Sequence, residues 1–381
     1  MKVLFATGRH YLPDRVGGGA NTSVHALLRG LADAGHECEA VAQLGPGPRY
    51  HALRLFRRLS GGGRSSLADL HNGYVTRRGV SWGIGELVDQ RLRAFRPDLL
   101  LTQLDQSEEI ARRALARATP IMLRFCDVEF AHFTGKLAGT AFQAIANSEF
   151  VARRLRDRFG MEAEVIYPAI RAQAYRAIRH QPEYVTFVNP SRLKGLDLAI
   201  EVAARLPRRK FLFQESWPMD HEERAEVRRR LSPLPNVTLE PVTRDMRGVY
   251  GRTALLLVPS RWEEAFARVV VEAHMNGIPV LATRIGGIPE SLADGGRLFE
   301  PEAGAAAWAE AVERLLSDDA HYARLSERAL ANAGRPEFDP TWGVARFIEI
   351  AERHVARHRG AERATPAAAS SYFAAAARVP S

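Results

Sequence analysis

Two acidic side chains flank the start of a predicted helix in the second half of the chain. Glu264 follows the apolar run 254–260, and Glu272 lies eight positions later within the run 265–277. Eight helical residues turn about 800°, about 80° beyond two full turns, so the two would share one side of a single helix only loosely. We therefore place Glu264 in the loop that ends a strand and Glu272 inside the following helix, which ends at Gly277.

The helix that carries Glu272 is otherwise apolar on its inner side. Val269, Val270 and Ala273 are predicted to face the core, which directs Glu272 toward the side where a ligand binds. The structural alternative is that Glu264 caps the helix and Glu272 forms a buried ion pair. Both interpretations stay open on spacing alone.

A lysine stands directly before another predicted helix, at residues 195–206. Only four of the 53 basic residues are Lys, so Lys194 persists in a chain that otherwise uses Arg. The compact ammonium of Lys differs from the forked guanidinium of Arg, and the helix dipole disfavours a cation at this end. A contact with phosphate explains the placement, and Arg192 lies close enough in sequence to assist. A plain surface lysine is the alternative.

Three consecutive glycines, Gly17, Gly18 and Gly19, connect the first predicted strand (2–7) to the helix 21–36. Glycines let backbone N–H groups approach a ligand, and a helix N-terminus favours negative charge. The spacing is not that of the dinucleotide-binding glycine motif. The alternative is a flexible loop.

Length and composition restrict the class of protein. The chain of 381 residues is long enough for two domains, and 46% of its residues are hydrophobic. No run of about 18 apolar residues predicts a transmembrane helix, and the apolar run after Lys2 is too short for a signal peptide. The two cysteines, Cys38 and Cys126, lie in strand-like surroundings, which fits a reducing cytoplasm rather than a disulfide framework.

The net charge of +9 is unevenly distributed. Seven Arg and one acid occupy residues 49–78, where Arg57 and Arg58 alternate with Leu and Phe. One interpretation is a patch for an anionic lipid or a phosphorylated acceptor, with peripheral contact at the inner membrane face. The other is a solvated, mobile surface loop. Nucleic acid is disfavoured, because no nucleic-acid-binding motif accompanies the charge.

Strand-like and helix-like runs alternate along the chain, which predicts an α/β protein with two doubly wound parallel sheets. We place an N-terminal Rossmann-like domain at 1–172 and a C-terminal one at 180–340. A helix at 341–360 is expected to cross back to the first domain, and the Ala/Ser/Pro-rich residues 361–381 read as a disordered tail. Ligands of such sheets bind at the carboxyl ends of strands, and with two domains a cleft between them is the natural site.

These motifs together resemble the retaining glycosyltransferases of family 4, which have the GT-B fold. The resemblance covers nearly the whole chain. It is carried by the glycine loop, "AIANSEF", the Lys-Gly loop, "VPS" before the acids, the Glu-x7-Glu spacing, "GIPVLAT" and "GGIPE". Glu-x7-Glu alone would be a weak signal.

The resemblance implies a role for each acid and for the residues that surround them. Glu264 would contact the hydroxyls of the donor sugar, and Glu272 those of the nucleotide ribose, since a carboxylate accepts several hydrogen bonds. The resemblance also implies that the glycine loop, Gly17 to Gly19, binds the donor nucleotide. The sugar would be transferred with retention, from a nucleotide-diphosphate donor to an acceptor hydroxyl, and no metal or other cofactor is expected.

The donor diphosphate has its own implied contacts. The backbone N–H groups of Phe266, Ala267 and Arg268 would hold it at the helix start, while Lys194 neutralises its charge. Many family members have Gly-Arg at the strand end where this chain has Asn-Pro, so Arg192 is the candidate for the missing arginine.

A second departure concerns the first domain. Family members often carry a His where this chain has Cys126-Asp127, with His132 a few residues on. Asp127 is therefore a candidate catalytic residue, and His132 a candidate for the acceptor or donor sugar. A structural carboxylate and a surface histidine are the alternatives.

Three other functions stay open. Two are enzymes of the same fold, a sugar-nucleotide epimerase and a phosphorylase. The third is a non-catalytic nucleotide- or phospholipid-binding protein. The acceptor class is also open between a lipid or polysaccharide precursor and a soluble phosphorylated molecule such as an aminocyclitol.

Overall fold

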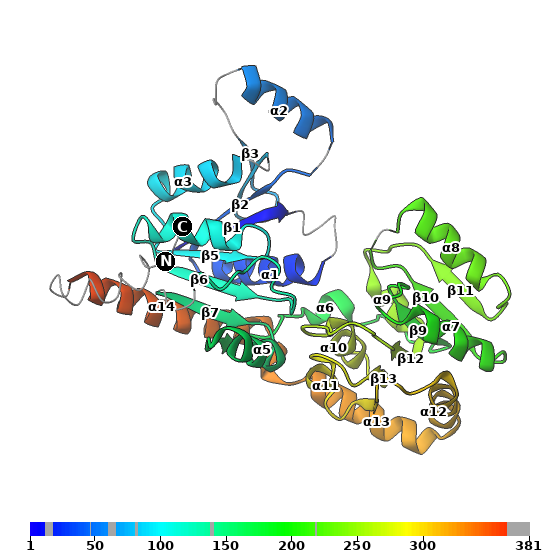
Figure 1. The fold of residues 1–381 in the computed structure, drawn as a ribbon. Coiled ribbons are helices and arrows are strands. Elements are labelled where there is room, and N and C mark those ends of the chain that lie inside the picture. The colour runs from blue at the N-terminus through cyan, green and yellow to red at the C-terminus, as the bar shows by residue number, and fades with distance from the viewer. Residues whose placement is uncertain are drawn as a thin grey trace. The chain divides into compact units, whose positions relative to one another are not determined.

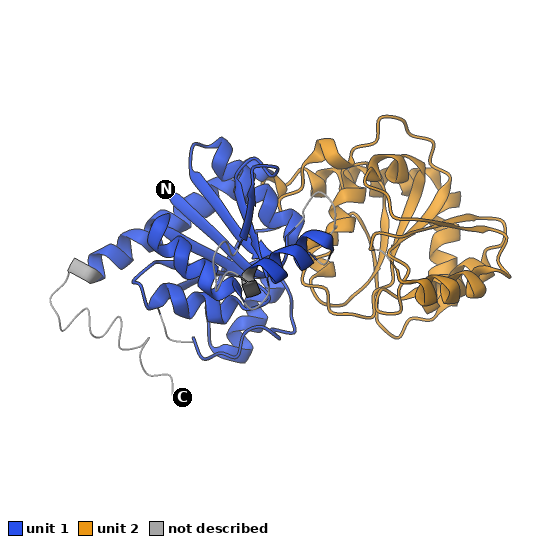
Figure 2. Cartoon of the chain, turned by 90° about the horizontal axis from the view of Figure 1, so that it is seen from above, with its two compact units in different colours: residues 1–16, 20–167, 340–381 blue, residues 17–19, 168–339 orange. Residues whose placement is uncertain are grey.

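The computed structural model describes residues 1–11, 18–45, 47–59, 66–80, 83–137, 141–217 and 219–363. Gly17 and the predicted tail beyond residue 363 lie outside these ranges, as do the side chains of Arg57 and Arg58. The chain divides into two compact units, residues 1–16, 20–167 and 340–381 in unit 1 and residues 17–19 and 168–339 in unit 2 (Figure 2). No helix among the described residues is long and apolar enough to cross a membrane.

Unit 1 is a doubly wound sheet of eight strands in the order β3-β4-β2-β1-β5-β6-β7-β8, with only β3 antiparallel (Figure 1). Its elements are β1 (Lys2–His10), α1 (Gly19–Asp33), β2 (Glu37–Gln43), α2 (Pro48–Leu59), β3 (Ser66–Asp69), β4 (Val75–Gly79), α3 (Ile84–Ala94), β5 (Leu99–Gln103), α4 (Ser107–Leu115), β6 (Ile121–Phe125), β7 (Phe142–Ala146), α5 (Glu149–Phe159), β8 (Glu164–Val165) and α14 (Pro340–Arg363).

The C-terminal helix α14 packs against unit 1. Phe347 and Ile350 join Val3 and Phe5 of β1 in one apolar core. Arg346 donates to Glu164 at 2.6 Å, which fixes the helix to the end of the sheet.

The Arg-rich segment of the first half is not one loop. It forms helix α2 and the strands β3 and β4, so the mobile-loop interpretation is wrong for the described part of 49–78. Arg77 and Arg78 are accommodated in β4 because each pairs with a carboxylate. Arg77 donates to the buried Glu39 at 2.6 Å, and Arg78 pairs with Asp69. Strand propensity alone would not place two arginines there.

Unit 2 holds a six-stranded parallel sheet in the order β11-β10-β9-β12-β13-β14 (Figure 1). Its elements are α6 (Ala172–Tyr175), β9 (Tyr184–Val188), α7 (Leu196–Arg205), β10 (Lys210–Gln214), α8 (His221–Leu231), β11 (Val237–Glu240), α9 (Met246–Arg252), β12 (Thr253–Val258), α10 (Arg268–His274), β13 (Val280–Thr283), α11 (Ile288–Leu292), β14 (Gly296–Phe299), α12 (Ala305–Ser317), α13 (Asp319–Ala333) and the 3-10 turn η2 (Pro336–Phe338).

Apolar residues on both faces explain this layered arrangement. Along β12, Leu255 and Leu257 pack on one side with α7 and α12, whereas Leu256 and Val258 pack on the other with α10 and α11. Successive strand side chains point to opposite faces, so an unbroken apolar run must be covered by helices on both. The loops at the carboxyl ends of the strands are then the part of the sheet left open to a ligand.

Candidate functional site

The loops after β9 and β12 are joined backbone to backbone at the carboxyl edge of the unit 2 sheet. Arg261 donates its N–H to the Leu193 carbonyl at 2.9 Å. Gly195 has φ +88°, and a Cβ built on it would lie 1.9 Å from the Pro259 carbonyl oxygen. Only glycine combines that backbone angle with that approach, so this position requires the Gly of the Lys-Gly pair.

The same loop after β12 is also held from the side of β13. Gly287 donates to the Glu264 carbonyl at 2.6 Å, and a Cβ on Gly286 would lie 2.6 Å from the same oxygen. Backbone hydrogen bonds thus join the three strand-end loops beside Lys194 and Glu264.

Lys194 and Glu264 are brought into direct contact. The Lys194 Nζ lies 2.9 Å from Glu264 Oε2, with the side chains 20% and 11% exposed. The ammonium also lies 5.4 Å from the centre of the Trp217 ring, a cation–π distance. A positive charge and a hydrogen-bond acceptor are therefore held side by side and partly out of water, where each acts more strongly than in bulk solvent.

The structure also decides the local roles of Arg192 and of the Glu264 capping alternative. Arg192 is exposed, and its carbonyl accepts the Gly195 N–H at 3.0 Å, so it belongs to the turn that carries Lys194. The helix-capping alternative for Glu264 has no support, because Ala267 is the N-cap of α10 and no side chain caps it.

The start of α10 differs from the prediction of a long helix with open N–H groups. The helix has seven residues. Phe266, just before it, packs on Phe338 with the ring centres 5.7 Å apart. The Arg268 N–H, predicted to bind diphosphate, donates to the Phe266 carbonyl at 3.2 Å. Ala267 is fully buried.

Glu272 is buried and has polar partners from its own helix and from α9. It is 6% exposed, accepts the Tyr250 hydroxyl at 2.8 Å and lies 3.4 Å from the Arg268 guanidinium. Burial raises the pKa of the Glu272 carboxyl, and Arg268 acts in the opposite direction. The ion pair left open as the structural alternative is therefore present.

Arg268 links this buried carboxylate to the segment around α6. Its guanidinium donates to the Tyr175 hydroxyl at 3.2 Å and to the Ala169 carbonyl at 3.3 Å. At the other end of α10, His274 contacts the Gly295 carbonyl and Asn332, and burial lowers its pKa to about 4. A neutral histidine thus fixes the helix that carries Glu272.

Residues of unit 1 gather at the carboxyl ends of β1, β5 and β6. His132 Nε2 lies 2.6 Å from Asp105 Oδ1, and Arg9 lies 2.9 Å from the other oxygen of Asp105. Sequence reasoning missed Arg9 and Asp105, although each lies at or just past the end of a predicted strand.

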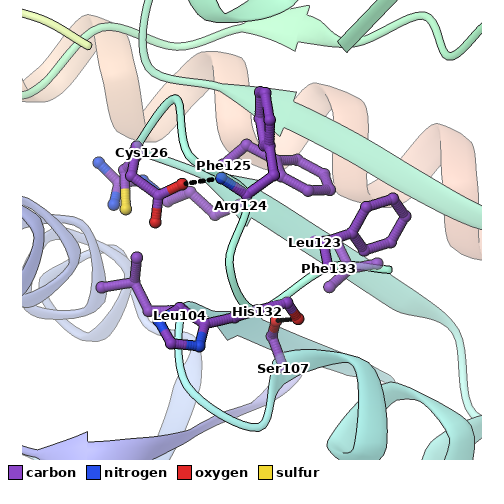
Figure 3. A pocket seen from close by; sticks show the side chains of 10 residues that line it. Leu104, Ser107, Leu123, Arg124, Phe125, Cys126, His132 and Phe133 are labelled. Atoms are coloured by element: carbon purple, nitrogen blue, oxygen red, sulfur yellow. Dashed lines mark hydrogen bonds between the residues drawn. The ribbon is translucent and has the colours of Figure 1, made fainter. Parts of the chain in front are cut away.

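Asp127 serves the local turn. Its Oδ1 accepts the Phe130 N–H at 3.1 Å, the geometry of a structural carboxylate. Asp127 and His132 line a hollow of about 20 Å³, which has room for about one water molecule. Figure 3 shows Leu104 and His132 close together on one side of it and Cys126 and Phe125 on the opposite side.

The remaining sequence candidates in the described part of the chain are Gly18, Gly19 and the basic helix α2. Of the glycines, Gly18 meets no atom within 4 Å of an added Cβ, and Gly19 begins α1. Helix α2 exposes Leu55 and Phe56.

Two family models match adjoining segments of the chain. The model described as "Glycosyl transferases group 1" matches residues 172–331, and the model described as "Glycosyltransferase Family 4" matches residues 17–174. The chain belongs to the family 4, group 1 glycosyltransferases. The resemblance stated from the motifs is thereby confirmed.

Curated relatives of this glycosyltransferase share parts of it. A D-inositol 3-phosphate glycosyltransferase of Corynebacterium aurimucosum is 32% identical over 142 residues, 35% of this chain and 32% of that protein. The enzyme of the same name from Nocardiopsis dassonvillei is 29% identical over 247 residues, 56% of this chain and 55% of that protein. The chain thus spans from about a third to about half of the length of these relatives.

Solved structures share the fold over nearly the full length. Anabaena HepE, crystallised with UDP-glucose, has a TM-score of 0.74 and 18% identity, covering 93% of this chain and all of that one. Sucrose-phosphate synthase from Thermosynechococcus elongatus has a TM-score of 0.74 and 17% identity, covering 94% of this chain and all of that one. The predicted α/β fold of the GT-B class is confirmed.

Proposed function

We propose that this glycosyltransferase moves a sugar from a nucleoside-diphosphate donor to a hydroxyl group of an anionic acceptor. The observation that carries the proposal is the Lys194–Glu264 pair, held at 2.9 Å by loops at the carboxyl edge of the unit 2 sheet. A cation beside a carboxylate suits a diphosphate next to a sugar, because the ammonium attracts the phosphate while the carboxylate accepts hydroxyl hydrogen bonds. HepE, with the same fold, was crystallised with UDP-glucose, which supports a donor of this class.

The proposed reaction retains the anomeric configuration and needs no metal. The bond from the anomeric carbon to the diphosphate oxygen breaks while the bond to the acceptor oxygen forms on the same face. The acceptor proton passes to the departing diphosphate oxygen, so no enzyme carboxylate acts as nucleophile, unlike in a retaining glycosidase. Lys194 stabilises the charge that gathers on the leaving group.

Glu264→Gln is expected to lower glycoside formation about a hundredfold or more, because a fixed carboxylate acceptor and the partner of Lys194 are both lost. The measurement is the initial rate of glycoside formation with the wild-type chain and each variant. Glu263→Gln is the matched control on the same loop and is expected to keep the wild-type rate. Near-normal turnover by Glu264→Gln would remove this residue from the site.

For Glu272 we propose contact with the ribose hydroxyls. Tyr250 donates to one oxygen and Arg268 lies 3.4 Å from the other, and a carboxylate has about four acceptor positions, so capacity remains. Glu272→Gln is expected to weaken UDP binding about tenfold, since hydrogen bonds to charged groups contribute about 1.5–3 kcal/mol, and to leave pyrophosphate binding unchanged. Calorimetric titration measures both. Unchanged UDP affinity with a lower free energy of unfolding would assign Glu272 a structural role only.

The acceptor we propose is a soluble phosphorylated polyol, the class named in the D-inositol 3-phosphate glycosyltransferases that the chain resembles. Arg9 and His132, at the strand ends of unit 1, are the candidate contacts for its phosphate and hydroxyl groups. Asp127 remains a weaker candidate, because its carboxylate already holds a turn.

Peripheral contact with an anionic membrane is the second candidate, and helix α2 favours it. Leu55 and Phe56 are 59% and 49% exposed on this Arg-bearing helix. Membrane contact predicts cosedimentation with phosphatidylglycerol vesicles that falls as salt rises, and less of it when both residues are replaced by Ser. Leu330→Ser, at a 47% exposed residue of α13, is the control. Absence of salt-sensitive binding would leave only the soluble acceptor.

A further inference from the structure

Trp217 is a large aromatic side chain at the strand-end edge of unit 2 to which the proposed mechanism gives no task. It follows β10, is 46% exposed and lies against the Lys194 ammonium. The exposed part of the indole offers a large flat apolar surface to a ligand at this edge.

The order of the strands fixes where Trp217 lies relative to the donor-binding pair. Strands β10, β9 and β12 are consecutive in the sheet, and the loops after them carry Trp217, Lys194 and Glu264 respectively. Lys194 therefore lies between the indole and the carboxylate, 5.4 Å from the ring centre and 2.9 Å from Glu264.

A nucleotide sugar has the same linear order. Its diphosphate joins the sugar on one side to the nucleoside on the other. With the diphosphate at Lys194 and the sugar at Glu264, the nucleoside extends toward the end of β10. We propose that Trp217 is the platform on which the nucleobase of the donor stacks, an assignment that rests on the proposed function of this edge.

The loop that carries Trp217 is fixed at both ends, as a stacking platform requires. Glu215, 2% exposed, receives two hydrogen bonds from Arg224 of α8, at 2.9 and 2.7 Å. On the other side, Asp220 caps α8 through a reciprocal pair of hydrogen bonds with Glu223. Fixed loop ends reduce the conformational freedom that is lost when a base stacks on the ring.

The neighbouring strand end supplies a second apolar surface and polar groups. Val242, in the loop after β11, is 41% exposed, and Gln214 donates to the Pro241 carbonyl at 2.6 Å, which joins the loops after β10 and β11. Within the described residues, Gln214 Oε1 and Asn189 Nδ2 are buried without a hydrogen-bond partner. Buried polar atoms without a partner at this edge are consistent with a bound group or water there.

The alternative is that Trp217 acts only on Lys194, by holding the ammonium through its ring. The two roles differ in which ligand they affect. A ring that only positions Lys194 influences every diphosphate equally, whereas a stacking ring influences only ligands that carry a base.

The test is calorimetric titration of the full chain and of Trp217→Ala and Trp217→Phe with UDP, GDP, ADP and TDP, and separately with inorganic pyrophosphate. For the nucleotide that the wild-type chain prefers, Trp217→Ala is expected to weaken binding about tenfold to a hundredfold, because stacking of a base on an aromatic ring has that effect. Pyrophosphate affinity is expected to change less than twofold, and Trp217→Phe to retain most of the nucleotide affinity.

Equal losses for the nucleotide and pyrophosphate, or no loss for either, would overturn the stacking assignment. If the wild-type chain binds none of the four nucleotides, the proposed function itself fails. Nucleotide binding that is insensitive to Trp217 overturns only this inference.

Discussion

Lys194→Ala is expected to lower the rate of glycosyl transfer by about 10²–10³-fold, the usual effect of removing one group that stabilises a developing anion. Lys194 is 2.9 Å from Glu264 and partly buried, so water replaces its charge poorly. Because the leaving diphosphate gains charge in the transition state, the loss should be larger in kcat than in donor affinity. Steady-state kinetics with the donor varied measures both.

Lys210→Ala is the matched control for this substitution. Lys210 begins β10, is exposed and pairs with Glu183. The substitution therefore removes the same charge from the same unit, but away from the strand-end loops. It should leave transfer within about twofold, in line with the small effects of surface ion pairs. Equal losses in the two variants would mean that net charge, and not the position of Lys194, matters.

Gly195→Ala is expected to have the second large effect, on stability and on nucleotide binding together. At φ +88° an alanine is strained by about 1–2 kcal/mol. Its Cβ would also lie 1.9 Å from the Pro259 carbonyl oxygen, so one of the two loops must move. We expect a loss of about 3 kcal/mol or more in the free energy of unfolding, together with loss of UDP affinity as Lys194 shifts. Denaturant unfolding and calorimetry measure the two effects.

Gly35→Ala separates the backbone angle from the clash. Gly35 has φ +86°, and an added Cβ would meet nothing within 4 Å. This variant should therefore lose only about 1–2 kcal/mol and keep nucleotide binding. If Gly195→Ala is no worse than Gly35→Ala, the close contact between the loops after β9 and β12 is not essential.

The contact between Lys194 and Glu264 could be anticipated because it depends on a general rule. In a parallel sheet the carboxyl ends of all strands lie on one edge, so residues that follow two strands meet even when 70 positions apart. The runs 183–190 and 254–260 were recognisable as strands by their apolar residues, and they contain the neighbours β9 and β12.

The burial of Glu272 could not be predicted from the sequence. Its partner Arg268 is one helical turn away, but Tyr250 belongs to α9, and Tyr175 and Ala169 belong to a segment about 100 residues earlier. Helical periodicity assigns a face and does not reveal whether a polar partner from another element covers it. The same limit explains β4, whose two arginines are accommodated by Glu39 and Asp69 from elsewhere in unit 1.

Trp217 and Asp105 were missed although a signal existed. Both follow predicted strands at the edge where ligands bind, Trp217 after β10 and Asp105 after β5. A rule that treats every residue just past a strand end as a candidate site residue includes both. What sequence could not supply is the contact of each with a neighbouring loop, Trp217 with Lys194 and Asp105 with His132.

The most direct test of the central claim is a donor screen on the wild-type chain with product analysis. Each nucleotide sugar is incubated with a panel of phosphorylated polyols in the presence of EDTA. Released nucleoside diphosphate and glycoside are quantified, and the anomeric configuration is determined by NMR. We predict equal amounts of the two products from one donor, with retained configuration and a rate insensitive to EDTA. Absence of glycoside across the panel, or epimerised donor in its place, would contradict the assignment.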